Sequence, residues 1–215
     1  MPHTLTAVAQ LIKVCTKAGW PPPVLLVVPG QPWSRSDLAQ LKAWESAGHE
    51  LAGHGWFHQI NAYGGLFHRL HGALISQQVA EHLCLDTEQI LALMQRCHAW
   101  FIDQALSPPR RYVPPAWALG DLPGYRLKEQ PFLQIETLRG VYDLSNQRWQ
   151  HRALLGYEAR NSLQHNLLTI SNAINRARAR WTGLRVGLHP NDLNLTLSAS
   201  LQSDLHRFSP LAPFH

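Results

Sequence analysis

The sequence is short of charge and has no long apolar run. Charged residues make up 15% of its 215 residues, and 45% are apolar, a composition that excludes a coiled coil or a disordered chain and suits one globular domain. No apolar run approaches the ~20 residues of a membrane span, and the N-terminus lacks the basic segment and apolar core of a signal peptide. We therefore expect a single domain over residues 1–215, with no membrane partner.

Cysteine is scarce as well. Cys15, Cys84 and Cys97 are an odd number, and their spacing fits no zinc site. Reduced and mostly buried thiols are expected, as in cytoplasmic proteins. A cytoplasmic location is therefore predicted.

Positive charge is present but dispersed. The net charge is +5, and the densest basic group is Arg176, Arg178 and Arg180. Their spacing spreads them over two faces of a helix, which is typical of a solvated surface. No nucleic-acid partner is expected.

Helices and strands alternate from the start of the chain. Residues 4–18 have apolar residues at helical spacing, and the apolar run 24–28 predicts a strand buried on both faces. A second helix, capped by Ser36 or Asp37, precedes a short strand that ends near Ala52. This order predicts a parallel sheet in an α/β fold. Such folds normally begin with a strand, and this chain begins with a helix.

The later part of the chain continues the pattern. A helix is predicted over 85–105, and 132–137 with 140–142 are predicted as two strands or a hairpin. Further elements are a strand at 154–157, a helix at 161–181, a strand at 184–188 and a last helix at 193–208.

Histidine is plentiful, with 13 residues, and one pair is placed for chemistry. His54 and His58 are four residues apart, so on one helical turn both imidazoles can reach the same metal ion. Gly53 and Gly55 flank the first of them and permit a sharp turn after a strand. Among 13 histidines some pair falls at this spacing by chance, so a structural role stays open.

Three segments, each after a predicted strand, suggest a family. They are His54-Gly55-Trp56-Phe57-His58, Tyr112-Val113-Pro114-Pro115-Ala116-Trp117 and Leu188-His189-Pro190. In this order they resemble motifs of the NodB-type polysaccharide deacetylases. The nearest resemblance is to a bacterial branch with His-Gly-x-x-His, Pro-Pro-Ala-Trp and His-Pro-x-Asp, and it covers nearly the whole chain.

The resemblance implies a fold and a chemistry. The fold would be an irregular (β/α) barrel of about seven strands. The activity would be metal-dependent hydrolysis of N-acetyl groups from an acetylated carbohydrate, with a divalent metal, usually zinc, held by two His and one Asp. Carried over to this sequence, the metal ligands are His54 and His58, and His189 protonates the leaving amine.

The resemblance also suggests residues around the substrate. The N–H of Ala116, after Pro115, would hold the developing oxyanion. Trp56 and Trp117, together with Pro115, would line a wall for a sugar ring, because flat apolar faces suit sugars.

The sequence departs from the family at its start. The family's first motif is a strand that ends in Asp, whereas this chain opens with Met1-Pro2-His3-Thr4-Leu5. We hypothesise that Met1 is an internal methionine taken as the start, or the edge of a fragment. As written, the chain is then expected to bind metal weakly and to hydrolyse little. The alternative is a catalytically inactive deacetylase-like or carbohydrate-binding domain.

Overall fold

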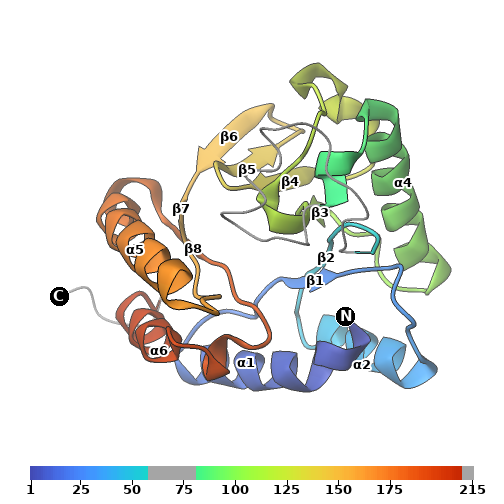
Figure 1. The fold of residues 1–215 in the computed structure, drawn as a ribbon. Coiled ribbons are helices and arrows are strands. Elements are labelled where there is room, and N and C mark those ends of the chain that lie inside the picture. Colours follow the sequence, from blue (N-terminus) through green and yellow to red (C-terminus); the bar gives the residue numbers. More distant parts are fainter. Residues whose placement is uncertain (58–80, 210–215) are drawn as a thin grey trace. The chain divides into compact units, whose positions relative to one another are not determined.

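A computed structural model describes residues 1–57 and 81–209 of the chain (Figure 1). They belong to two compact units: Met1–Pro2 with Val24–Gln150, and His3–Pro23 with His151–His215. Each unit is described by itself below. The predicted α/β class is confirmed, because both units combine helices with a β-sheet. The single domain over 1–215 stays a prediction.

The first unit is built on a six-stranded mixed sheet. Its strands, in spatial order, are β1 (Leu25–Val27), β2 (Leu51–Gly53), β3 (Arg111–Tyr112), β4 (Gln134–Thr137), β5 (Gly140–Asp143) and β6 (Arg148–His151). Strands β1 to β4 pair in parallel, and β4 pairs antiparallel with β5. The predicted parallel sheet and the hairpin are thus both present. Strand β6 was not predicted, because Arg-Trp-Gln-His has no apolar alternation.

Strand β1 corrects one expectation. Leu25 and Val27 are buried, whereas Leu26 points to the opposite side of the sheet and is 37% exposed. The prediction of a strand buried on both faces is therefore wrong. Strand β1 is the end strand of the sheet, where fewer neighbouring side chains cover a residue.

Two capped helices belong to this unit, α2 (Arg35–Ser46) and α4 (Thr87–Asp103). The N-cap of α2 is Ser34, whose Oγ accepts from the N–H of Asp37, while the Asp37 carboxylate accepts from the N–H of Ser34. The cap was predicted at Ser36 or Asp37, and Asp37 is instead the reciprocal partner of a capping box. Asp86 caps α4 in the same way with Gln89.

Short 3₁₀ helices complete the connections. They are η1 (Pro2–Thr4), η2 (Glu81–Cys84), η3 (Pro115–Trp117), η4 (Gly124–Glu129) and, in the second unit, η5 (Asp192–Asn194).

The core of the first unit contains a buried polar pair. His82 and Tyr112 are both 0% exposed, and His82 Nε2 lies 2.6 Å from the Tyr112 hydroxyl. The other ring nitrogen, Nδ1, lies 3.1 Å from the carbonyl oxygen of Leu119. Because a carbonyl oxygen only accepts, Nδ1 carries the proton, and Nε2 accepts from the hydroxyl. Burial lowers the pKa of His82 to about 4, so the ring is neutral at pH 7.

The second unit packs three helices with a two-stranded parallel sheet. Its elements are α1 (Leu5–Lys17), β7 (Ala153–Leu155), α5 (Ser162–Thr182), β8 (Leu184–Val186) and α6 (Ser198–Arg207). Leu11 and Cys15 of α1 and Leu201 and Leu205 of α6 are buried in one apolar core with Leu155. The three cysteines are free thiols, and Cys84 alone is partly exposed, as predicted.

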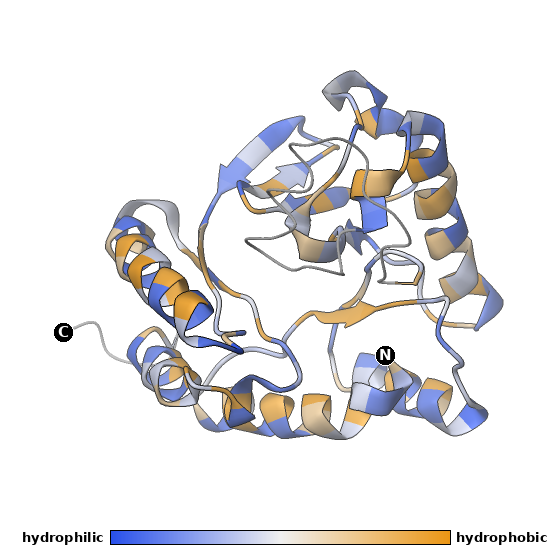
Figure 2. Ribbon diagram, viewed as in Figure 1, coloured by the Kyte–Doolittle hydropathy of each residue, from blue (hydrophilic) through white to orange (hydrophobic). Residues whose placement is uncertain are grey.

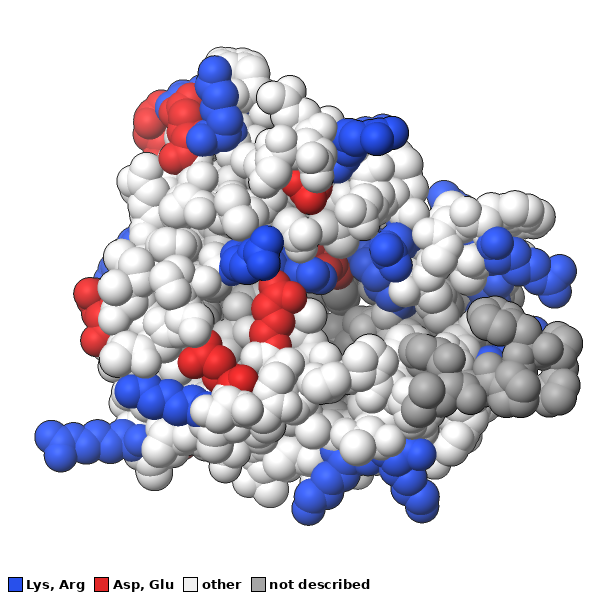
Figure 3. All heavy atoms as spheres, turned by 180° about the vertical axis from the view of Figure 1, so that it is seen from behind, with Lys and Arg blue, Asp and Glu red and all other residues white. Residues whose placement is uncertain are grey.

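Two surface observations concern partners. Within residues 1–57 and 81–209, no helix is long and apolar enough to cross a membrane. On the face drawn in Figure 3, Lys and Arg side chains lie at several separate places, some of them beside Asp and Glu side chains. The exclusion of nucleic-acid and membrane partners stays a prediction.

Neutral His82 makes stability depend on pH. Its pKa is about 6.5 in an unfolded chain and about 4 in the fold. The unfolded state therefore binds more protons at low pH, and the contribution of His82 is lost as pH falls from 6.5 through 4, by up to about 3 kcal/mol. We expect urea unfolding of the His82→Gln variant to show a free energy of unfolding that no longer falls in this way between pH 6.5 and 4. A variant of the exposed His206, His206→Gln, should keep the fall. An unchanged fall in His82→Gln contradicts the assignment.

Candidate functional site

His54 directly follows strand β2 and is fixed by both neighbouring strand ends. Its N–H donates to the carbonyl of Val27, the last residue of β1, at 3.0 Å. On the other side, the N–H of Val113 donates to the carbonyl of Gly53, at 2.9 Å. The carboxyl ends of three parallel strands therefore meet around His54, as predicted for a site in an α/β fold.

The imidazole of His54 has a defined tautomer. Its Nδ1 lies 2.6 Å from the main-chain oxygen of Val113. Because that oxygen only accepts, Nδ1 carries the proton and Nε2 carries the lone pair. Histidines that bind metals are commonly oriented in this way, by an Nδ1–H bond to a carbonyl or carboxylate. A half-buried His54 in this tautomer fits the donor that a zinc ion requires.

A buried carboxylate anchors the residues after His54. Glu81, at the start of η2, accepts from the N–H of Trp56 at 2.8 Å and from the N–H of Phe57 at 3.2 Å. Only 9% of Glu81 is exposed. Hydrogen bonds to an ionised acceptor are about twice as strong as neutral ones, so Glu81 holds this turn in place.

Gly55 lets three segments close on one another. Its φ is +68°, a left-handed conformation that glycine adopts without strain. A Cβ added there would lie 2.6 Å from Glu81 Oε2 and 2.7 Å from Pro115 Cγ. The structure thus brings His54, the Pro-Pro-Ala-Trp turn and Glu81 together, although they are far apart in the sequence.

The Pro-Pro-Ala-Trp turn has a strained backbone. Ala116 and Trp117 both have φ +54°, which is uncommon for residues with a Cβ and costs about 1–3 kcal/mol each. The N–H groups of Trp117 and Ala118 donate within the turn, to Pro114 and Pro115. Neither proline has an N–H, so Ala116 supplies the N–H that the turn itself does not use. The oxyanion role of Ala116 stays a prediction.

The aromatic wall is partly covered. The guanidinium of Arg96 lies 3.6 Å from the centroid of the Trp56 ring, so one face of that ring is occupied. Gly30 packs closely against Trp56, because a Cβ at Gly30 would lie 2.6 Å from both Trp56 Nε1 and Trp56 O. A sugar could therefore stack only on the other face of Trp56. Trp117 is partly exposed, and Pro115 is buried.

Two glutamates at strands of the first unit have structural partners. Glu50 and Glu136 form ion pairs with Arg111, at 3.4 Å and 3.2 Å. Glu50 also precedes β2, whereas His54 follows it, so the two lie at opposite ends of the strand. This placement agrees with Glu50 as a strand-end charge rather than a base.

His189 belongs to the second unit, where acidic groups surround it. It follows β8, and its N–H donates to Asp192 Oδ2 at 2.8 Å. Glu158 Oε2 lies 3.3 Å from Nε2, and Asp192 Oδ2 lies 3.9 Å from Nδ1. Asp192 is the first residue of η5, whose N-cap is Asn191, and it is 0% exposed. Its carboxylate therefore binds the His189 backbone and does not cap the helix.

Sequence reasoning missed two of these carboxylates. Glu158 follows strand β7 as His189 follows β8, and the two strands are parallel neighbours, so the topology could have indicated the pair. Nothing in the sequence marks Glu81. The second predicted ligand, His58, lies outside the described residues. Within residues 1–57 and 81–209, no three His, Cys, Asp or Glu side chains form a metal-binding group.

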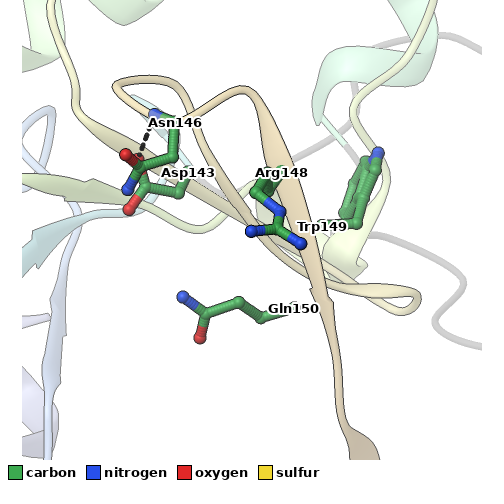
Figure 4. Close-up of a pocket in the computed structure, with 5 residues that line it drawn as sticks. All are labelled: Asp143, Asn146, Arg148, Trp149 and Gln150. Carbon is green, nitrogen blue, oxygen red and sulfur yellow. Dashed lines mark hydrogen bonds between the residues drawn. The ribbon is translucent and has the colours of Figure 1, made fainter.

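A surface hollow of about 570 Å³ lies at the β5–β6 hairpin. It is lined by Asp143, Asn146, Arg148, Trp149 and Gln150, with Arg148 and Gln150 on one side of β6 and Trp149 on the other (Figure 4). The N–H of Asn146 donates to Asp143 within the turn. None of the predicted site residues contributes to this hollow.

Removal of the Glu81 carboxylate tests its anchoring role. Glu81→Ala leaves two N–H groups without their acceptor, and we expect it to lower the free energy of unfolding by about 2–3 kcal/mol, with a smaller loss for Glu81→Gln. Glu88 is a matched control, because its side chain is 74% exposed in an ion pair with Arg126. Urea unfolding of Glu88→Ala should show less than about 1 kcal/mol. Equal effects of the two alanine variants would contradict the role.

Replacing the buried Asp192 by a neutral residue is expected to stabilise the protein above about pH 6. Burial raises its pKa to about 6, against the neighbouring His189, which acts to lower it. A raised pKa means stability that is complete below pH 3.8 and lost as pH rises through 6. Asp192→Asn keeps an acceptor for the His189 N–H without the buried charge. We expect it to be more stable than the natural chain by up to about 3 kcal/mol at pH 8 and equally stable at pH 4, whereas a variant of the exposed Asp121, Asp121→Asn, differs little at either pH.

The comparisons with known proteins identify no relative. No family model matches the chain, and the searches of curated proteins and of solved structures found no match.

Proposed function

We propose that the protein is a metal-dependent hydrolase that removes N-acetyl groups from a carbohydrate. The sequence motifs resemble NodB-type polysaccharide deacetylases, and the parallel order of β1 to β4 is compatible with part of the irregular (β/α) barrel of that family. The barrel and its absent first strand remain part of the proposal.

One observation carries the proposal: the 2.6 Å contact between His54 Nδ1 and the carbonyl of Val113. It orients the ring and, with the proton on Nδ1, supports Nε2 as the nitrogen that would coordinate an ion. His54 and His58 would hold the ion, which would supply Lewis-acid polarisation of a water and of the acetamide carbonyl.

The chain's own groups have separate tasks in this proposal. Glu81 fixes the two N–H groups after His54, so the ring stays in place when substrate binds. The N–H of Ala116, within the strained turn, donates a hydrogen bond to the acetamide oxygen as negative charge develops on it. Trp117 and the uncovered face of Trp56 contact the sugar ring.

His189 is proposed to give a proton to the leaving amine. Glu158 and Asp192 flank its two ring nitrogens, which restricts the rotation of the imidazole. Orientation by a carboxylate is a common device for histidines that transfer protons.

The test is a zinc titration by calorimetry, followed by an assay of acetate release from an acetylated chito-oligosaccharide. We expect weak binding to the natural chain, lowered at least tenfold in His54→Ala, since a lost ligand costs at least as much as a lost orienting partner. Acetate release is expected to be slow, to require zinc and to disappear in the same variant.

Two controls separate the interpretations. Val113→Ala keeps the main-chain acceptor and should bind zinc as the natural chain does, and exposed His206→Ala should do likewise. Zinc binding that depends on His54 without any acetate release favours the non-catalytic carbohydrate-binding alternative. Zinc binding that is unaffected by His54→Ala would contradict the proposed metal site at His54.

A further inference from the structure

Helix α5 is attached to its unit by polar side chains. The side-chain amide of Asn172 donates to the carbonyl of Gly156 at 2.7 Å and accepts from the Gly156 N–H at 3.1 Å. The amide of Asn175 donates to the carbonyl of Leu154 in β7 at 2.9 Å. Asn172 is 1% exposed. The inner face of α5 therefore meets β7 and the residue after it through amide side chains that satisfy backbone groups, beside Leu168, which packs against the apolar core.

The apolar side of the same helix faces outward. Five large side chains lie exposed on it: Leu163 (67%), Leu167 (44%), Ile170 (60%), Ile174 (56%) and Trp181 (82%). Figure 2 shows apolar residues repeated along the length of α5. Isolated exposed apolar residues are normal, but a contiguous stripe of them marks an interaction surface.

The spacing of the stripe specifies another helix as its partner. With exposed Ala177 included, successive members are four, three, four, three and four residues apart. This is the heptad repeat of a coiled-coil seam, and it extends over nearly the full length of α5. A narrow seam of this kind fits one facing helix, whereas a membrane-surface helix presents a broad apolar face.

Charge decides the direction of pairing. Helix α5 contains no Asp or Glu, and its basic residues gather near its C-terminal end. Arg176 is bound to Asp204, and Arg178 and Arg180 flank the exposed seam. A parallel second copy would place these arginines against each other. An antiparallel copy places them beside neutral Gln164 and Asn166.

We propose that α5 is the contact between two copies of this chain, paired antiparallel about a point midway between Ile170 and Ile174. Ile170 then faces Ile174 of the second copy, and Leu163 faces the second copy's Trp181. Leu167 faces the small Ala177, so large and small side chains alternate. Such an interface is isologous, with the same surface used by both copies.

The area is adequate for a reversible dimer. The five large side chains expose roughly 600 Å² per copy, against the ~800 Å² per partner of a standard interface. This proposal is independent of the proposed function, because α5 contains none of the residues assigned to chemistry.

The experiment is sedimentation velocity of the full chain over about 1–100 µM. We expect a monomer–dimer equilibrium that Ile170→Glu weakens at least 100-fold, since pairing would bury two unpaired carboxylates. The matched control is Ile102→Glu, because Ile102 is 53% exposed on α4, outside the seam. Its dimer should be unchanged. Far-UV circular dichroism and urea unfolding verify that both variants fold.

A mixture of two variants tests the direction. Antiparallel pairing sets position 170 opposite 174, so Ile170→Glu mixed with Ile174→Lys should regain a dimer that neither variant forms alone. A failure of the mixture to dimerise overturns the antiparallel arrangement. A natural chain that stays monomeric, dimers that persist in Ile170→Glu, or co-sedimentation of a monomer with anionic vesicles would each overturn the proposal.

Discussion

Parallel pairing of β2 with the strands on either side is the constraint on which the candidate site depends. The N–H of His54 is bound to Val27, and the carbonyl of Gly53 is bound to Val113. These two hydrogen bonds fix the register, and a slip by one residue would turn the imidazole to the other side of the sheet. In the observed register, the carbonyl of Val113 lies at the ring, and the turn that follows it packs against Gly55.

The sequence predicted those features that follow from local periodicity. The strand ending before His54, the strand before the Pro-Pro-Ala-Trp turn and the capped helix α4 were all recognisable from apolar spacing and from Gly, Pro and Asp at their ends. The main-chain partners of His54 could not be recognised, because every residue has a backbone carbonyl and the sequence does not mark the one that accepts from the ring. Glu81 was missed for a related reason: its partners are backbone N–H groups.

Helix α5 illustrates a second limit of sequence reasoning. Apolar periodicity predicted the helix correctly, but it does not state which side meets the sheet. Two stripes of helical spacing exist on α5, one apolar and one carrying Asn172 and Asn175. The amide stripe faces β7, because those side chains match backbone groups that a leucine could not satisfy. The orientation of α5 depends on hydrogen bonds between its amide side chains and another segment. Such bonds cannot be predicted from the hydropathy of the helix alone.

The main-chain acceptor at residue 113 also has an evolutionary consequence. Any residue other than proline that fits the buried space of Val113 provides the same carbonyl oxygen and the same N–H for Gly53. Selection on the histidine would then require its side chain, whereas its orienting partner could change among apolar residue types. Descendants of this protein could differ at residue 113 in this way and still hold the ring in the same tautomer.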